Sequence, residues 1–242
     1  WAEDIDIYQG TSSGAAPNML IILDNAAAAS ASSSFTCPSL TVNDPGKNLG
    51  FEQCGLYGAV SAIGTNKALN GNINLGLMYF PGGPTNGGTF VVPPASPAPG
   101  SLQLMDGTTT DNTKGVGKML RRIESLSLSQ DKGNNNQIAQ AMQEAWAFYQ
   151  GKTGLSGTTY PGLANQQACA RNFVLYITLA TNNQKPQDSG NMGGMALQSA
   201  EGLSALPAQL ALPNWKSPLS PYSTASSKYR SDYADEWANF MY

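Results

Sequence analysis

The chain has 242 residues, a formal net charge of −3 and only 12% charged side chains, and its 41% hydrophobic share fits a single α/β domain with a buried core. The absence of histidine excludes Ser-His-Asp and Cys-His catalysis and most catalytic zinc sites, so we expect a protein that is not an enzyme. Lysine and arginine form no run beyond Arg121-Arg122, and no apolar run approaches the roughly 20 residues of a membrane span, which argues against nucleic-acid binding and against a spanning helix.

Three short apolar runs, each bounded by turn residues, predict buried strands. They cover residues 19–23, 73–80 and 173–179. None of them alternates between polar and apolar side chains. Continuous apolar runs favour a parallel sheet that is covered on both faces.

Apolar residues at helical spacing lie between and after these runs. The predicted helices cover residues 51–65, 113–128, 137–149 and 231–241. The first has an apolar stripe made of Phe51, Cys54, Tyr57, Val60 and Ile63. Strands that alternate with helices imply right-handed crossovers and an α/β fold with a doubly wound, mostly parallel sheet and helices on both faces. Ligands of such sheets bind at the carboxyl ends of the strands.

Two segments interrupt this alternation. Residues 81–100 are rich in proline and glycine around Phe90-Val91-Val92 and are interpreted as an exposed hairpin or loop excursion. Residues 182–227, with a weak helical patch over residues 197–210, form either a functional surface loop or a partly disordered segment. We therefore expect one domain over residues 1–242 with two long insertions. Its last helix would normally lead into another strand, so we also expect that the final strand and any further domain are missing.

The three cysteines and the first residue indicate in which cellular compartment the protein is expected. Cys37 and Cys54 flank a loop rich in Pro, Gly and Asn, which favours a disulfide in an oxidising compartment, while the alternative is three reduced, buried thiols. Cys169 would then be left to pair with a cysteine outside this chain. The chain starts at Trp1 rather than Met, as expected for a mature product whose secretion signal has been removed, or for a sequence that omits it.

Residues 18–30 read Asn-Met-Leu-Ile-Ile-Leu-Asp-Asn-Ala-Ala-Ala-Ala-Ser and resemble the first strand of a von Willebrand factor A-type domain. In that family the strand ends in Asp-x-Ser-x-Ser, which forms part of a metal-ion-dependent adhesion site. The corresponding ligand positions here are Asp24, Ala26, Ala28, Asn136 and Leu179. Hard divalent cations need oxygen ligands, and alanine and leucine side chains supply none. The resemblance therefore implies a degenerate site, binding without a divalent metal, and no cofactor.

A buried carboxylate at the end of a strand needs partners. One hypothesis is a hydrogen bond between Asp24 and Asn136 in place of the metal. Another is that Asp24 only caps a turn, and a third is that serines among residues 30–34 rebuild the metal site. The candidate residues of a binding face are Asp24, Asn25, Asn134, Asn135 and Asn136.

A narrower resemblance rests on the order and spacing of several segments. Residues 3–8, 17–25, 51–57, 171–178 and 234–242 resemble the mature start of the PilC/PilY family. This implies a non-enzymatic adhesion or assembly protein at the tip of a type IV pilus, exported to the surface of a Gram-negative bacterium. Its implied partners are minor pilins, the pilus tip complex, or a host or abiotic surface. The alternatives are a structural subunit of an extracellular filament or surface layer, and a hydrolase, which the dispersed acids disfavour.

Three other features are interpreted as structural. The glycines of Gly115-Val116-Gly117 resemble a phosphate-binding loop but lack its spacing, so they predict an ordinary helix start. Asp131 opens an acidic and amide-rich segment that is interpreted as a solvated loop. Trp146 and Trp237 fall on predicted helices, and we expect them to be packing residues.

Overall fold

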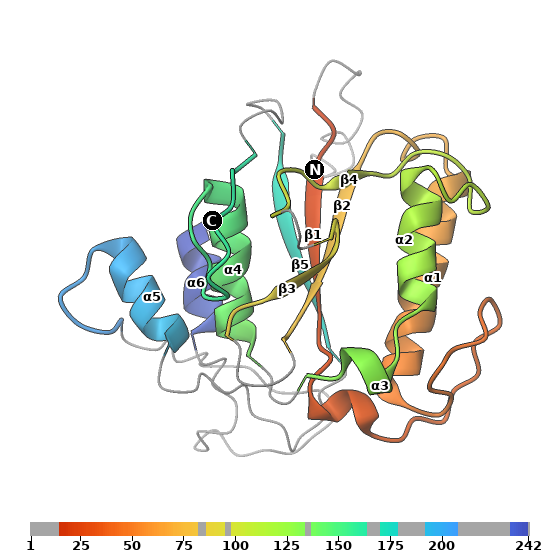
Figure 1. The fold of residues 1–242 in the computed structure, drawn as a ribbon, viewed down its shortest axis with the longest axis horizontal. Coiled ribbons are helices and arrows are strands. Elements are labelled where there is room, and N and C mark those ends of the chain that lie inside the picture. Colours follow the sequence, from red (N-terminus) through yellow and green to blue (C-terminus); the bar gives the residue numbers. More distant parts are fainter. Residues whose placement is uncertain are drawn as a thin grey trace, which may run out of the picture.

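A computed structural model of the chain describes residues 15–81, 86–94, 98–133, 137–163, 170–178, 192–207 and 233–241. These residues form a mixed α/β fold with an open, mostly parallel sheet between two layers of helices (Figure 1). The strands follow the order β3-β2-β1-β5, and β4 pairs with β2 off this path. Their bounds are β1 Asn18–Leu23, β2 Asn74–Tyr79, β3 Thr89–Val92, β4 Gln103–Leu104 and β5 Asn172–Ile177.

The parallel part of the sheet is the trio β2, β1 and β5, which confirms the three predicted strands. In the register of this trio, Asn18 of β1 lies opposite Asn74 and Asn172. The Asn18 amide donates to the Asn172 side-chain oxygen at 2.9 Å and accepts from the Asn74 amide at 2.9 Å. A one-residue slip would break this ladder and move the apolar side chains to the opposite face, so the ladder helps to fix the register.

Alternate residues of β1 enter two different hydrophobic cores. Leu20 and Ile22 pack toward one helical layer, and Ile21 and Leu23 pack toward the other. Strand β1 is therefore covered on both faces, as its continuous apolar run predicts. The helices are α1 Asn48–Thr65, α2 Gly115–Glu124 and α3 Leu128–Asp131 on one side, and α4 Ile138–Gln150, α5 Met192–Glu201 and α6 Ala234–Met241 on the other (Figure 1).

Two of the predicted helices differ markedly from the helices in the structure. The helix predicted over residues 113–128 is confirmed only over α2, Gly115–Glu124, because Ser127 takes an extended conformation (φ −153°, ψ 149°) that separates α2 from α3. The weak helical patch predicted over residues 197–210 begins earlier, as α5, and ends at Glu201. The start of α2 at Gly115 agrees with the interpretation of its glycines as a helix start.

The buried face of α1 also differs from the predicted stripe. Phe51 is exposed and packs edge-on against Phe35, with ring centroids 4.9 Å apart. Leu56 and Gln53 point into the protein instead, and Gln53 donates to main-chain carbonyls at the end of α2. The tryptophans pack as expected, since the Trp146 and Trp237 rings lie 5.6 Å apart between α4 and α6.

Residues 89–92 agree with the hairpin alternative for residues 81–100 but correct the expected exposure of this segment. They form β3, which pairs antiparallel with β2. Phe90 and Val92 are buried, and the Phe90 ring packs 4.9 Å from the Phe148 ring. The apolar side chains of this short run are therefore part of the core. Residues 82–85 and 95–97 lie outside the described residues.

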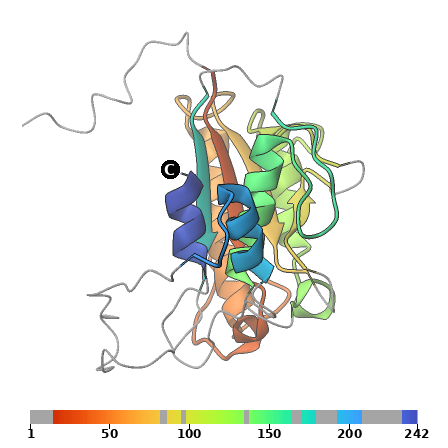
Figure 2. The same cartoon turned by 90° about the vertical axis from the view of Figure 1, so that its left-hand side faces the viewer.

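Strand β5 departs most from its prediction, because only one of its faces is well covered. Val174 and Tyr176 pack against the core under α4 and α6, whereas Phe173 is 38% and Leu175 is 43% exposed. In the order of the described strands, β5 ends the sheet. Figure 2 shows this strand, in teal, at the edge of the sheet behind α6. An apolar strand that ends the sheet of the described residues is a natural place for contact with other polypeptide.

A disulfide joins Cys37 to Cys54, with the two Cα atoms 5.8 Å apart, as the sequence predicts. It attaches the loop that precedes α1 to the helix itself. Cys169 lies outside the described residues. Within the parts of the chain that the structure describes, no helix is both long enough and apolar enough to cross a bilayer.

Candidate functional site

Asp24 follows β1 at the carboxyl edge of the parallel strands, which is the lower edge of the sheet in Figure 1. From β1 the chain passes to β2 on one side, while β5 pairs with β1 on the other. Asp24 therefore lies at the topological switch point, where open α/β sheets commonly bind their ligands. Its main-chain N–H donates to the Ile177 carbonyl at 2.9 Å, which holds it against the end of β5.

The side chain of Asp24 is 2% exposed, and donors from the described residues reach both oxygens of its carboxylate. The Ala26 N–H donates to Oδ1 at 3.0 Å, which forms a turn cap of the kind that aspartate favours. The Tyr176 hydroxyl at 3.0 Å and the Thr178 hydroxyl at 2.7 Å both donate to Oδ2. Asp24 therefore does more than cap a turn, because its second oxygen ties β1 to β5.

The other ligand positions of the resemblance fit a metal poorly. Ala26 is fully buried within the core that contains Ile22 and Phe80, so its methyl group fills apolar space. Ala28 lies in the short helix η2, Ala27–Ser30. The Ser30 hydroxyl donates to the Ala27 carbonyl at 2.7 Å, a contact within η2 itself. Among the described residues, no group of three or more His, Cys, Asp or Glu side chains is placed to hold a metal ion.

Four of the predicted site residues lie outside the described residues, namely Asn134, Asn135, Asn136 and Leu179. The hydrogen bond between Asp24 and Asn136 therefore stays a prediction. The structure does show that Tyr176 and Thr178, which the sequence did not single out, supply donors to this carboxylate. Both face Asp24 because residues of β5 and β1 are paired in parallel register.

No protein-family model, no curated protein and no solved structure matches this chain.

Asn25, proposed from the sequence as part of a binding face, is fully buried. Its side-chain amide donates to the Phe80 carbonyl at 2.8 Å and accepts from the Phe80 N–H at 2.8 Å. The same amide also donates to the Asp131 carbonyl, and the Asn25 carbonyl accepts from the Gly133 N–H. Asn25 thus joins the ends of β1, β2 and α3, and its side chain is not presented to a ligand.

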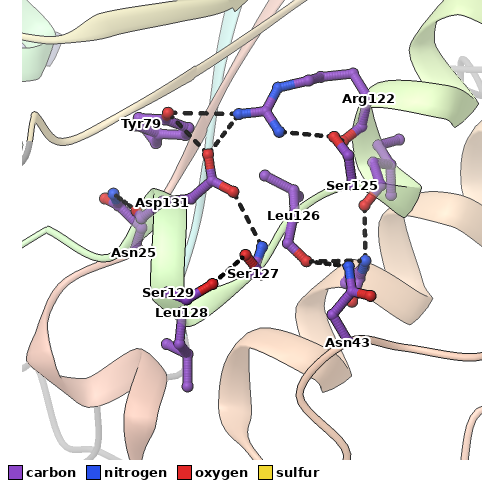
Figure 3. A network of polar contacts seen from close by, with 12 residues as sticks. Asn25, Asn43, Tyr79, Arg122, Ser125, Leu126, Ser127, Leu128, Ser129 and Asp131 are labelled. Atoms are coloured by element: carbon purple, nitrogen blue, oxygen red, sulfur yellow. Dashed lines mark hydrogen bonds and ion pairs between the residues drawn. The ribbon is translucent and has the colours of Figure 1, made fainter.

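Asp131 is buried, so the interpretation of this residue as part of a solvated loop is wrong. Its Oδ1 accepts from the Tyr79 hydroxyl at 2.9 Å and from the Arg122 guanidinium, and its Oδ2 accepts from the Ser127 N–H at 3.0 Å (Figure 3). Burial and the neighbouring Asp131 charge raise the pKa of the Tyr79 hydroxyl. The carboxylate is buried because a positive charge and two further donors compensate for the loss of water.

Another buried carboxylate, Glu144 of α4, anchors the loop that follows this helix. It accepts from the Ser156 N–H at 2.9 Å, the Ser156 hydroxyl at 2.6 Å and the Tyr160 hydroxyl at 2.5 Å. Burial and the Glu144 charge raise the pKa of the Tyr160 hydroxyl. A Cβ atom on Gly154 would lie only 2.0 Å from Glu144 Oε1, so glycine is required where the loop crosses the carboxylate.

A groove of about 700 Å³ lies between β5, α4 and α6, beside the open edge of the sheet. Large apolar side chains make up most of its lining, and the Tyr149 hydroxyl donates to the Phe173 carbonyl at 3.0 Å within it. Gln150 and Asn172 are its polar residues. The large residues that line the groove are Trp146, Tyr149, Phe173, Phe240 and Met241.

Proposed function

We propose that this chain is a von Willebrand A-like binding module of the PilC/PilY type that acts without a divalent metal. In this proposal it is exported to the tip of a type IV pilus, where it binds minor pilins, the tip complex or a surface. The class of partner rests on the resemblance of the sequence segments. The metal independence rests on one observation, the hydrogen bonds that Tyr176 and Thr178 donate to Asp24.

A divalent ion at Asp24 would have to displace these donors. Hydrogen bonds to a charged group contribute about 1.5–3 kcal/mol each, so their loss opposes binding of the ion. Mg²⁺ requires a near-octahedral set of oxygen ligands, and the buried methyl group of Ala26 offers none. The arrangement thus supports a switch point whose Asp24 carboxylate is already hydrogen-bonded by neighbouring side chains. In this proposal the binding surface lies elsewhere on the molecule.

Two further observations support binding rather than catalysis. Three of the buried carboxylates, Asp24, Asp131 and Glu144, are each held by donors that stabilise the fold. Phe173 and Leu175 are exposed on β5, and exposed apolar patches commonly mark sites of contact with other macromolecules.

Calorimetric titration with Mg²⁺, Mn²⁺ and Ca²⁺ tests the metal independence. We expect no specific binding, and micromolar binding that is lost in an Asp24→Asn variant would overturn this part of the proposal. Pull-down of purified minor pilins, with and without a chelator, tests the partner. We expect capture that the chelator does not change.

A second candidate function is a structural subunit of an extracellular filament. The exposed apolar edge of β5 favours it, because such an edge can pair with another copy of the chain. Antibody labelling of native filaments separates the two functions. Labelling at the tip supports the adhesion or assembly role, and labelling along the shaft supports the structural subunit.

A further inference from the structure

The segment between η2 and α1, residues 31–47, forms a closed loop that is attached to α1 by the disulfide. Its two ends meet at an antiparallel bridge between Ser32 and Lys47, and the Ser33 N–H donates to the Gly46 carbonyl at 2.9 Å. The Cys37–Cys54 disulfide fixes the middle of the loop to the helix. We name this segment the stapled loop.

The stapled loop holds the connection between α2 and α3 from outside. The Asn43 amide donates to the Glu124 carbonyl at 2.8 Å and to the Leu126 carbonyl at 2.9 Å. The Asp44 carboxylate accepts from the Leu128 N–H at 2.7 Å, at the first residue of α3. Figure 3 shows Asn43 directed at this connection. The start of α3 therefore depends on two side chains of the stapled loop.

The same connection continues to the carboxyl edge of the sheet. The Ser127 N–H donates to Asp131, and Asp131 accepts from Tyr79 at the end of β2 (Figure 3). The Asp131 carbonyl accepts from Asn25, the residue next to Asp24. Contacts thus run from Asp44, which follows Cys37 in the stapled loop, through α3 to the switch point.

We propose that the Cys37–Cys54 disulfide is a thiol-sensitive latch that keeps the carboxyl edge of the sheet in this arrangement. The inference concerns regulation of the fold and does not rest on the proposed function. Both cysteines are only half-buried, and the Ser39 hydroxyl lies 3.6 Å from Cys37 Sγ and 3.9 Å from Cys54 Sγ. A disulfide sulfur carries no hydrogen, so Ser39 is the donor in these contacts.

The reaction is exchange with a dithiol. One thiolate of the dithiol attacks a sulfur of the bridge, which forms a mixed disulfide and releases the other cysteine as a thiolate. The second thiol of the dithiol then attacks the mixed disulfide and releases the first cysteine. The dithiol is oxidised to its own disulfide, and its two electrons and two protons end on Cys37 and Cys54. The Ser39 hydroxyl is placed to donate to the thiolate that leaves.

Hydrogen exchange of the oxidised and the dithiothreitol-reduced chain, without denaturant, tests the latch. After reduction we expect the amides of Ser127 and Leu128 to exchange at least about tenfold faster, because their acceptors lose their fixed positions. Residues 153–160, held by Glu144 on the other side of the sheet, are the internal control and should change less than about twofold. Alkylation and mass measurement establish that both cysteines are reduced.

Two outcomes would overturn the latch. One is unchanged exchange of Ser127 and Leu128 after full reduction. The other is loss of protection throughout the chain, residues 153–160 included, since the disulfide would then stabilise the whole domain rather than one edge. A Cys37→Ser/Cys54→Ser double variant should show the fast exchange without any reductant.

Point variants test whether the effect of the disulfide is transmitted through Asp44. Asp44→Ala in the oxidised chain should by itself speed exchange at Leu128, and reduction should then add less than about threefold. A full additional effect of reduction would contradict transmission through Asp44. Ser39→Ala should slow the reaction with dithiothreitol, while Ser34→Ala, an exposed serine of the same loop, is the matched control and should leave its rate unchanged.

Discussion

The Thr178 hydroxyl donates to the Asp24 carboxylate at 2.7 Å, although the two residues are 154 positions apart in the chain. The contact exists because β1 and β5 lie side by side in parallel, so both residues leave the sheet at the same edge. Tyr176 of β5, two positions before Thr178, donates to the same oxygen. At the position where a metal would be expected from the family resemblance, the structure has two hydroxyl donors.

Removing both hydroxyls should destabilise the protein. For Tyr176→Phe and Thr178→Val we expect a loss of about 1–2 kcal/mol each, and about 3 kcal/mol in the double variant, because a buried carboxylate loses donors. Urea unfolding measures the change. Thr41→Val, an exposed threonine, is the control and should stay within about 0.5 kcal/mol of the parent protein. A double variant as stable as the control would show that the hydroxyls do not stabilise Asp24.

Gly154 should tolerate no side chain. In Gly154→Ala the new methyl group would approach Glu144 Oε1 to 2.0 Å, and we expect a loss of about 2–3 kcal/mol from this overpacking. Differential scanning calorimetry should show a midpoint lower by about 5–10 °C. Gly58→Ala is the matched control, because a Cβ atom there meets open space on α1. It should raise stability by up to about 1 kcal/mol through helix propensity, and equal effects of the two substitutions would contradict the packing at Glu144.

Stability should fall at alkaline pH partly because of Tyr160. Its pKa in the folded protein is raised above the ordinary value of 10.0, first by burial and then by the Glu144 charge. The unfolded chain therefore releases the tyrosine proton first, so the stabilisation is complete below the unfolded pKa and is lost as the pH rises above it. Urea unfolding from pH 8 to about 11.5 measures this loss.

In Tyr160→Phe the alkaline loss should be smaller, although the variant is less stable at neutral pH. Ser156→Ala is the control, because it also removes a donor from Glu144 but keeps the titrating hydroxyl. It should retain the alkaline loss of the parent protein. Identical pH profiles of the parent and Tyr160→Phe would refute the assignment. Some loss remains in every variant, because burial also raises the pKa of Tyr79 and Tyr149.

The open face of β5 should contribute to binding rather than to folding. In a Phe173→Lys/Leu175→Lys variant we expect a stability change below about 1 kcal/mol, since both side chains are already largely exposed, together with at least tenfold weaker capture of the partner or of a second copy. Surface plasmon resonance and sedimentation velocity measure the two kinds of contact. Leu69→Lys/Leu203→Lys changes two equally exposed leucines elsewhere on the surface and serves as the control. Equal binding by both variants would remove β5 from the interface.

The local sequence was sufficient to predict several elements. The apolar runs around Leu20 and Leu77 form strands, and the apolar residues around Ala141 and Phe148 form a helix, because burial favours one face or both faces of a regular element. The Cys37–Cys54 pair followed from composition and from the loop between the cysteines. Even the position of Asp24 at the end of a strand was readable from its neighbours.

The sequence did not predict which distant residues these side chains contact. The burial of Asp131 depends on Arg122 and Tyr79, which reach it from a different helix and a strand. The exposure of Leu175 depends on which strands and helices stand beside β5. An apolar run has the same composition whether one of its faces is covered or both are, so periodicity alone does not distinguish the two cases.

The sequence by itself determined the alternation of strands and helices, the disulfide, and an aspartate at the carboxyl end of β1 without serines at the next ligand positions. Only the tertiary structure decided that the Tyr176 and Thr178 hydroxyls donate to the Asp24 carboxylate. It also decided that Asn25 and Asp131 connect the strand ends to α3. The reason is that propensity and burial act over a few neighbouring residues, whereas a hydrogen bond to a buried carboxylate depends on the register of strands that are far apart in the chain.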